Sequence, residues 1–277
     1  MSRRQFGALT GLAAVAACAP QNGAVAQSGS DSTPSSELPG GMVSFATEDG
    51  TMDGRFIPAP GGPAPAVIHW PDIAGVRGSH LQMAQRTAQA GYSVLVVNPY
   101  YRDVAGVIWE DFASFADGGW SRAREMRRKL SSFAVKRDAA AIVEWLDAQE
   151  AVDGSRGIGA EGYCMGGPFT VYSAHAMPSR IRAAASFHGG GLVRDDEESP
   201  HRLLEDTQAS YLIAIAQDDD AEAPDHKTVF AESAEAAGRS AKVEVYAGDH
   251  GWTVLDSPAY AEAAAEKAFA DKLALYA

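Results

Sequence analysis

Cysteine is scarce in this chain, whose 277 residues include only Cys18 and Cys164. Two cysteines cannot form the disulfide framework that stabilises many small secreted domains. Cys18 lies in an N-terminal segment that we expect to be separate from the folded part, so Cys164 is expected to be the only thiol there and to be free. A lone thiol lacks a resolving partner, which argues against a peroxide sensor that cycles through a disulfide.

Basic residues are also in short supply, because 23 Lys and Arg stand against 36 Asp and Glu and give a formal net charge of −13. This excess of negative charge argues against nucleic acid or an anionic lipid surface as a partner. The local exception, "SRAREMRRK" at residues 121–129, has the pattern of a solvated helix face. The sequence shows neither metal-ligand spacing nor a phosphate-binding glycine loop, so we expect no cofactor.

An apolar run near the N-terminus is too short to cross a bilayer. It covers residues 8–17, whereas a membrane-spanning helix needs about 20 apolar residues. The run follows Arg3-Arg4 and Phe6, so the segment 1–26 resembles the signal that directs folded proteins to the twin-arginine export machinery.

Two processing sites in this segment remain open as alternatives. The motif "AVAQ" has the small-x-small pattern of signal peptidase and predicts cleavage after Ala26. The motif "VAAC" resembles a lipobox, in which Cys18 would carry a lipid anchor. Both alternatives predict a periplasmic or otherwise extracytoplasmic protein. The Ser/Pro/Gly-rich residues 27–41 are then a flexible linker to a domain that spans residues 42–277.

In this domain, short apolar runs alternate with segments of helical periodicity. The β-branched runs at 65–70 and 92–99 predict buried strands, and the segment between them predicts a helix with Ser79 as its cap and Gly91 as its stop. Further strands are predicted at 157–163, 181–189, 211–217 and 242–248, and further helices at 135–150, 165–177 and 258–277. This alternation predicts the α/β class, with a mainly parallel twisted sheet and helices on both faces.

Functional sites in such sheets lie beyond the carboxyl ends of the strands. At one such end, "GYCMGG" predicts a strand running into a helix with Cys164 at the bend. A nucleophile elbow forces its central residue into a strained turn, so the residues two before and two after must be small, as Gly162 and Gly166 are. The dipole of the following helix would favour a thiolate. A small buried cysteine in a glycine-rich turn is the structural alternative.

Candidates for an acid and a base follow later strands. The strand that ends in "AQDDD" offers three carboxylates, of which the spacing favours Asp219 for orienting an imidazole, with Asp218 second; Asp220 fits a solvated turn. His250, in "GDHGW", follows the last predicted strand and is the expected base. His188, in "SFHGGG", resembles a lipase oxyanion loop but comes after the elbow, so we do not expect it in the site. The resulting order of nucleophile, acid and base is that of the α/β-hydrolase fold.

Together these motifs resemble the dienelactone hydrolase family over the whole predicted domain. The resemblance is carried by "HWPDIAGVRG", "NPYYRD", "GYCMGG", "AQDDD" and "GDHGW". It implies an α/β-hydrolase fold with a triad of Cys164, Asp219 and His250. It also implies an oxyanion hole formed by the backbone N–H groups of Ile73 and Met165.

The same resemblance implies positions that contact the substrate. Asp72 matches a carboxylate near the sulfur, Arg102 in "YYR" matches an arginine that grips a substrate carboxylate, and Trp252 lies in the histidine motif. A second arginine of the family pattern, four residues beyond the histidine, is replaced here by Val254. One anion-binding group is therefore absent.

We therefore predict a cysteine-dependent hydrolase that cleaves a small ester or lactone through a thioester intermediate. A thiolate attacks activated carbonyls well and leaves readily from a thioester, whereas amides and unactivated esters demand more from the oxyanion hole. Sulfur thus favours strained lactones, enol esters and other reactive carbonyl compounds. The alternative is a non-catalytic protein on the same scaffold, which would bind a small ligand tightly without turnover.

Overall fold

The structure, a computed structural model, describes residues 38–277. The predicted signal segment 1–26, with Cys18, and most of the predicted linker 27–41 lie outside the described residues, so both stay predictions. Among residues 38–277, no helix combines the length and the apolar character that a membrane span requires. The first strand begins at Gly41, just before the predicted start of the domain.

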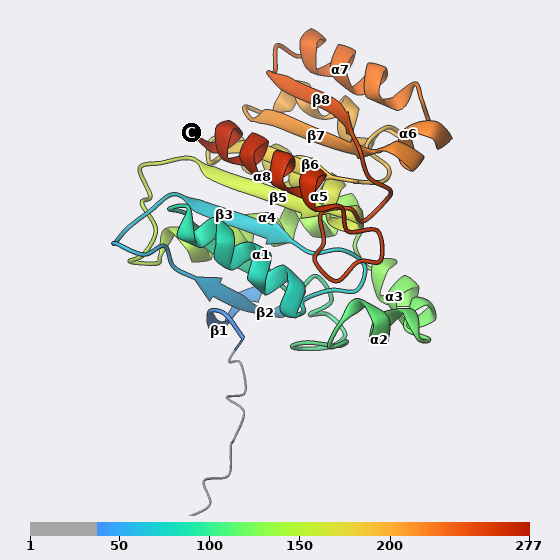
Figure 1. The fold of residues 1–277 in the computed structure, drawn as a ribbon. Coiled ribbons are helices and arrows are strands. Elements are labelled where there is room, and N and C mark those ends of the chain that lie inside the picture. The colour runs from blue at the N-terminus through green and yellow to red at the C-terminus, as the bar shows by residue number, and fades with distance from the viewer. Residues whose placement is uncertain (1–37) are drawn as a thin grey trace, which may run out of the picture. The chain divides into compact units, whose positions relative to one another are not determined.

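Eight strands form one sheet in the order β1-β2-β4-β3-β5-β6-β7-β8 (Figure 1). The pairings β1–β2 and β2–β4 are antiparallel, and all the others are parallel. The strands are β1 (Gly41–Thr47), β2 (Gly50–Ile57), β3 (Ala66–Trp70), β4 (Ser93–Val97), β5 (Ile158–Tyr163), β6 (Ile181–Phe187), β7 (Ser210–Ala216) and β8 (Ala241–Tyr246). This mainly parallel sheet confirms the predicted fold class.

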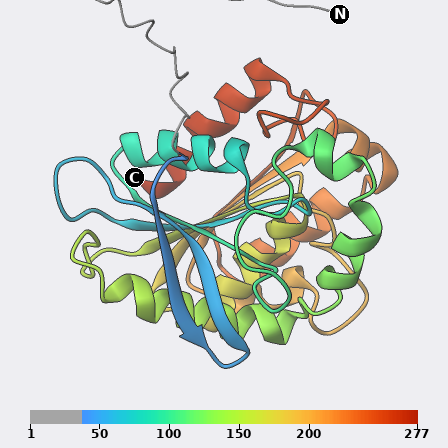
Figure 2. The same cartoon turned by 90° about the horizontal axis from the view of Figure 1, so that it is seen from below.

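Helices pack on both faces of the sheet (Figures 1 and 2). The helices are α1 (Gly78–Gln89), α2 (Phe112–Ala116), α3 (Trp120–Arg127), α4 (Ser132–Asp147), α5 (Gly167–Ala176), α6 (Gln217–Glu222), α7 (His226–Ala236) and α8 (Glu262–Tyr276). Helices α1 and α8 cover one face, and α4 and α5 cover the other, each joining a cluster of buried strand residues. Three short 3-10 turns are η1 (Cys164–Gly166), η2 (Pro200–Arg202) and η3 (Leu204–Asp206).

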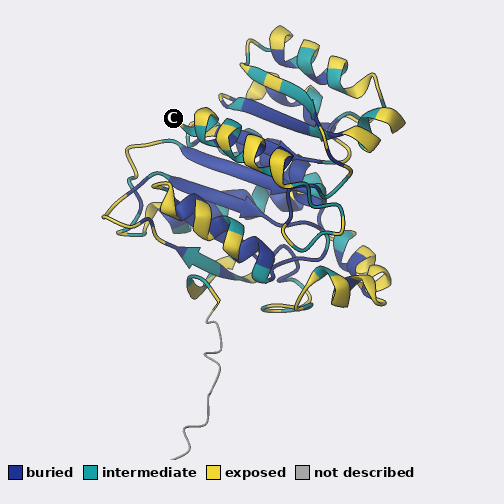
Figure 3. Cartoon of the chain, in the orientation of Figure 1, coloured by how far each residue is buried: buried dark blue, intermediate teal, exposed yellow. Residues whose placement is uncertain are grey.

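The central strands are buried along their whole length (Figure 3). Every residue of β3, β4 and β5 is buried, whereas the edge strands β1 and β8 are only partly covered. Burial on both faces explains why apolar, β-branched runs predicted the central strands. Glu161, in the middle of β5, is a fully buried carboxylate and needs buried partners.

Helix α1 begins differently from the prediction. Its N-cap residue is Arg77, in an extended conformation, and Ser79 lies buried in the first turn instead of capping it. The guanidinium of Arg77 donates hydrogen bonds to Asp72 and Asp256. Ion pairs therefore fix the chain before this helix, which the local sequence pattern could not indicate.

Candidate active site

Cys164 occupies a strained bend between β5 and α5. Its φ of +51° lies in the left-handed region, which residues with side chains rarely adopt. A Cβ atom at Gly162 would lie 2.0 Å from the carbonyl oxygen of Gly166, and one at Gly166 would lie 2.5 Å from the carbonyl oxygen of Trp70. Both positions therefore require glycine, as a nucleophile elbow does.

His250 and Asp219 are joined through the ring nitrogen Nδ1. This nitrogen lies 2.8 Å from Oδ2 and 3.0 Å from Oδ1 of Asp219. The neighbouring Asp218 accepts a hydrogen bond from the backbone N–H of His250 at 2.8 Å. Asp219 is thus positioned to orient the imidazole, and Asp218 to shape the loop that carries it.

The environment of His250 favours its protonated form. Burial lowers the pKa of His250, but the hydrogen bond with Asp219 and the proximity of Cys164 outweigh burial and raise the pKa to about 10. The imidazole thus lies between the carboxylate and the sulfur. It is placed to carry a proton next to Cys164.

A cavity of about 240 Å³ opens over the sulfur. It is lined by Asp72, Ile73, Phe112, Trp120, Cys164, His188, His250, Gly251 and Ser257. Isoleucine and two aromatic side chains contribute its apolar walls. A space of this size holds a small organic molecule with its reacting carbonyl next to the thiol.

The two N–H groups expected to form an oxyanion hole lie in this region. Among the hydrogen bonds of residues 38–277, the backbone N–H of Ile73 has no acceptor. The N–H of Met165 lies in the first turn after β5, where backbone donors lack partners within the helix. The hydroxyl of Tyr100 donates to the carbonyl oxygen of Ile73 at 2.8 Å and contacts the sulfur of Met165 at 3.4 Å, which holds the two segments together.

Asp72 lines the cavity, but its carboxylate is occupied by Arg77. The guanidinium donates two hydrogen bonds to Asp72, at 2.7 and 2.8 Å, and two to Asp256, at 2.8 and 2.9 Å. Burial would raise the pKa of Asp72, but His80 and Arg77 hold it well below its usual range. This carboxylate is therefore ionised and held by Arg77, so its oxygens are not free to bond to the thiol.

Arg102 does not lie in the cavity, contrary to the prediction. Its guanidinium bonds to Asp138 at 2.8 and 2.9 Å and to Asp49 at 2.7 Å, and it lies 4.5 Å from the ring centre of Tyr101. These partners belong to α4 and to the turn between β1 and β2. The "YYR" segment thus fastens the β1–β2 hairpin to the rest of the domain, and its arginine is not available to a substrate in the cavity.

Trp252, predicted to contact the substrate, does not line the cavity either. The side chain is fully buried and stacks on Tyr246, with ring centres 4.9 Å apart and an interplanar angle of 11°. Its other aromatic neighbour is His188, at 6.0 Å. Trp252 therefore packs in the core beneath the site and is not among the residues that line the cavity.

His188, which we did not expect in the site, lines the cavity. Its backbone has a φ of +40°, its ring lies 5.1 Å from the ring of His250, and its Nε2 is 2.8 Å from the hydroxyl of Thr253. Burial and the nearby His250 lower its pKa to about 3, so this imidazole is neutral. The missed signal was its place at the carboxyl end of β6, because β6 pairs directly with the strand that carries Cys164.

A chain of buried polar side chains runs from the cavity toward helix α8. His80 lies 3.4 Å from the backbone nitrogen of Asp72 and 2.8 Å from His69, which in turn lies 2.6 Å from Glu161. The second oxygen of Glu161 is 2.7 Å from the ammonium of Lys272. All five side chains are buried.

In this row of buried polar groups, each member can donate a hydrogen bond to the next one, from Asp72 toward Glu161. The N–H of Asp72 donates to His80, His80 donates to His69, and His69 donates to Glu161. Burial lowers the pKa of His80 to about 4, although Asp72 opposes that shift. These buried side chains thus support the Asp72 loop from below.

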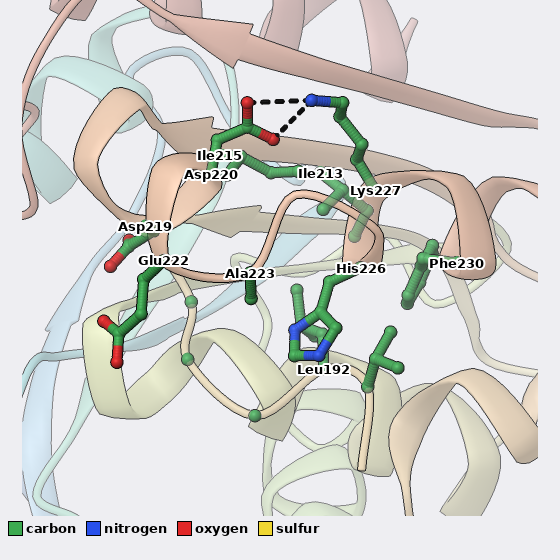
Figure 4. A pocket seen from close by; sticks show the side chains of 14 residues that line it. Leu192, Ile213, Ile215, Asp219, Asp220, Glu222, Ala223, His226, Lys227 and Phe230 are labelled. Atoms are coloured by element: carbon green, nitrogen blue, oxygen red, sulfur yellow. Dashed lines mark hydrogen bonds and ion pairs between the residues drawn. The ribbon is translucent and has the colours of Figure 1, made fainter.

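A second cavity, of about 360 Å³, lies on the other side of the Asp219 loop (Figure 4). It is bounded by β7, by the segment from α6 to α7 and by the glycine-rich residues 189–193. Figure 4 shows Asp220 joined to Lys227 on its wall, with distances of 2.6 and 2.8 Å. Neither the sulfur of Cys164 nor the ring of His250 lines this cavity. The described residues contain no group of three or more His, Cys, Asp and Glu side chains suited to a metal ion.

Two curated proteins, both described as "Putative carboxymethylenebutenolidase", are similar to this chain. The protein from Synechocystis sp. is 28% identical over 131 residues, which is 47% of this chain and 50% of that protein. The protein from Methylorubrum extorquens is 27% identical over 192 residues, which is 65% of this chain and 60% of that protein. The matches thus span about half to three fifths of the length of these relatives.

A solved structure has a closely similar fold. The "Putative Dienelactone Hydrolase" from Klebsiella pneumoniae aligns with a TM-score of 0.71 at 23% identity, covering 85% of this chain and 97% of that one. The model of the dienelactone hydrolase family matches residues 52–277, from β2 to the last helix, and so includes every residue that lines the Cys164 cavity. The chain therefore belongs to the dienelactone hydrolase family.

Proposed function

We propose that this protein is a hydrolase that cleaves a small ester or lactone with Cys164 as nucleophile. The observation that carries the proposal is that Cys164 and His250 line the same cavity. Asp219 is hydrogen-bonded to Nδ1 of the imidazole. Nucleophile, proton carrier and orienting carboxylate are the three parts that covalent acyl transfer needs.

In the first step, the thiolate of Cys164 attacks the carbonyl carbon of the substrate. The raised pKa of His250 keeps its imidazole protonated at neutral pH, so a proton donor lies beside the sulfur when it attacks. As the C–S bond forms, the carbonyl electrons move to oxygen, which accepts hydrogen bonds from the N–H groups of Ile73 and Met165. One such donor is typically worth about 10²–10³-fold in rate.

In the second step, the tetrahedral intermediate breaks its C–O bond and leaves a thioester on Cys164. The departing alkoxide takes the proton of His250, and in a lactone the alcohol stays attached to the acyl chain. The neutral imidazole then removes a proton from water, whose oxygen attacks the thioester. Collapse of this second intermediate expels the thiolate and releases the acid, and His250 keeps the proton.

The proposal predicts that Cys164→Ala abolishes hydrolysis of p-nitrophenyl acetate, measured as release of p-nitrophenolate. Iodoacetamide should inactivate the unmodified protein in the same way, because it alkylates the attacking sulfur. Asp220→Asn is a matched control, since Asp220 pairs with Lys227 rather than with the imidazole, and should keep activity within about twofold of the parent. Full activity in Cys164→Ala, or after complete alkylation, would refute the proposal; tight ligand binding without turnover would favour the non-catalytic alternative.

A further inference from the structure

The walls of the Cys164 cavity opposite the polar groups are aromatic. Phe112, at the start of α2, and Trp120, at the start of α3, both line it. Behind them Phe115 is fully buried, with ring centres 5.4 Å from Phe112, 4.6 Å from Trp120 and 5.2 Å from Trp109. The two wall residues thus belong to an aromatic cluster, which gives them a fixed position.

Hydrogen bonds hold this wall against the rest of the site. The backbone N–H of Phe112 donates to Asp256 at 2.9 Å, and the guanidinium of Arg77 lies 5.7 Å from the centre of the Phe112 ring. Asp256 belongs to the loop after His250, and Arg77 belongs to the loop after β3. The aromatic wall is therefore joined to two of the loops that line the cavity, those after β3 and β8.

No lysine or arginine lines the cavity within residues 38–277. The guanidinium of Arg77 is shared between two carboxylates, Asp72 and Asp256, so this group of three side chains carries an excess of negative charge. Arg102 is bound to Asp49 and Asp138. The position four residues beyond His250 is Val254, a buried apolar side chain.

We propose that this cavity selects esters and lactones whose acyl group is uncharged and apolar, and that it rejects those whose acyl group carries a carboxylate. The proposal rests on the proposed function and adds its substrate class. An apolar acyl chain would displace water from Phe112 and Trp120, whereas a carboxylate would lose its hydration without gaining a lysine or arginine partner. The His250 imidazolium at the cavity is already paired with Asp219. The carboxylates of Asp72 and Asp256 would repel it further.

Arg127 is the residue that would oppose this inference. Its guanidinium lies 5.4 Å from the ring centre of Phe169 and donates to the carbonyl oxygen of Leu130 at 2.9 Å. Burial lowers its pKa, although Tyr100, Tyr172 and Cys164 oppose that shift. Because Arg127 is not among the residues that line the cavity, we do not expect it to reach a bound acyl group.

The test compares two p-nitrophenyl esters of nearly equal shape. The monoadipate ends in a carboxylate, and the 6-methylheptanoate carries an isopropyl group at the same place. After subtraction of spontaneous hydrolysis, kcat/KM should be at least about tenfold higher for the 6-methylheptanoate, a ratio that one missing charge partner in a binding site readily produces. An equal or higher value for the monoadipate would overturn the inference.

Substitutions in the aromatic wall test whether this wall causes the preference for the 6-methylheptanoate. Trp120→Ala should reduce the preference for the 6-methylheptanoate, and Phe112→Arg should raise kcat/KM for the monoadipate by supplying the missing cation. Phe133→Ala is the matched control, because Phe133 is a 60% exposed aromatic residue on α4 outside the cavity, and it should leave the ratio unchanged. An unchanged ratio in both wall variants would contradict the proposed role of these walls.

Hydrolysis of p-nitrophenyl acetate, measured with every variant, separates the proposed function from the proposed substrate class. Hydrolysis of the acetate together with a preference for the monoadipate would leave the proposed function standing and remove the proposed substrate class. A loss of that preference in Arg127→Gln would then identify Arg127 as the anion-binding group. Failure of the parent protein to hydrolyse any of the three esters would remove both.

Discussion

Two adjacent carboxylates in one loop, Asp218 and Asp219, contact different parts of His250. Asp218 and Asp219 differ by a single position, yet one accepts a hydrogen bond from the backbone of His250 and the other from its ring. The sequence favoured Asp219 by its distance from the strand end, and in the structure Asp219 is the one that lies against the imidazole ring. Orientation of this kind depends on the turn that α6 makes after β7, which the run of three aspartates does not encode.

The titration of His250 should depend on Asp219. In the folded protein its pKa is raised to about 10, so the imidazolium is present below that pH, and the proposed leaving-group protonation is lost as pH rises through about 10. Because an unfolded histidine has a pKa of about 6.5, the contribution of His250 to the free energy of unfolding is complete below about pH 6.5. It is lost as the pH rises from about 6.5 to about 10. Asp219→Asn should therefore move the titration of His250 to lower pH.

NMR of ¹³C-labelled histidine rings would measure this shift directly, with His250→Gln to assign the signal. Asp218→Asn is the matched control, because Asp218 accepts from the backbone of His250 rather than from its ring and should shift the titration less. A titration in Asp219→Asn that coincides with that of the parent would show that the carboxylate does not set the protonation of the imidazole.

Motif resemblance failed for Arg102 because its partners come from distant segments, and for Trp252 because its ring packs into the core. Arg102 pairs with Asp49 and Asp138, which lie 53 and 36 residues away in the sequence. Trp252 stacks on Tyr246 in the core. A side chain in the correct motif can thus serve the fold, and only the spatial partners show which of the two roles it has.

At the scale of elements, the buried strands were predictable and the polar contacts between them were not. Continuous apolar runs indicated β3, β4 and β7, because strands covered on both faces need apolar side chains throughout. The chain from His80 through His69 and Glu161 to Lys272 joins α1, β3, β5 and α8. These residues are far apart in the sequence, so they find their hydrogen-bond and ion-pair partners only when the elements pack together.

Lys272 offers a direct test of this buried chain. Lys272→Met should destabilise the domain by about 3–5 kcal/mol, because Glu161 would be left buried without its cation. Lys267→Met on the same helix is the matched control; Lys267 is 46% exposed and pairs with Glu244 and Asp271 at the surface, so its loss should cost less than about 1 kcal/mol.

Urea unfolding at neutral pH, followed by circular dichroism, would give both free energies of unfolding. The double variant Glu161→Gln with Lys272→Met should recover part of the loss, since it removes both charges of the pair. Equal effects of Lys272→Met and Lys267→Met would mean that the Glu161 pair contributes no more than a surface ion pair.

At the scale of the whole molecule, five neighbouring strands each deliver one group to the same end of the sheet. Ile73 follows β3, Cys164 follows β5, His188 follows β6, Asp219 follows β7 and His250 follows β8. The sequence indicated that functional loops follow the carboxyl ends of parallel strands, which was enough to find the three proposed triad residues. The sequence does not reveal the order of strands in space, so His188, which follows the strand next to β5, was missed.

The central claim is that the substrate's acyl group passes through a covalent bond to Cys164. Acid quenching during turnover of p-nitrophenyl acetate, followed by peptide mass spectrometry, tests it most directly. The account predicts one acetyl group on Cys164, bound as a thioester that hydroxylamine removes, and none on the same peptide of Cys164→Ala. Turnover of the ester with an unmodified Cys164 under conditions that preserve thioesters, or with the acetyl group on another residue, would contradict it.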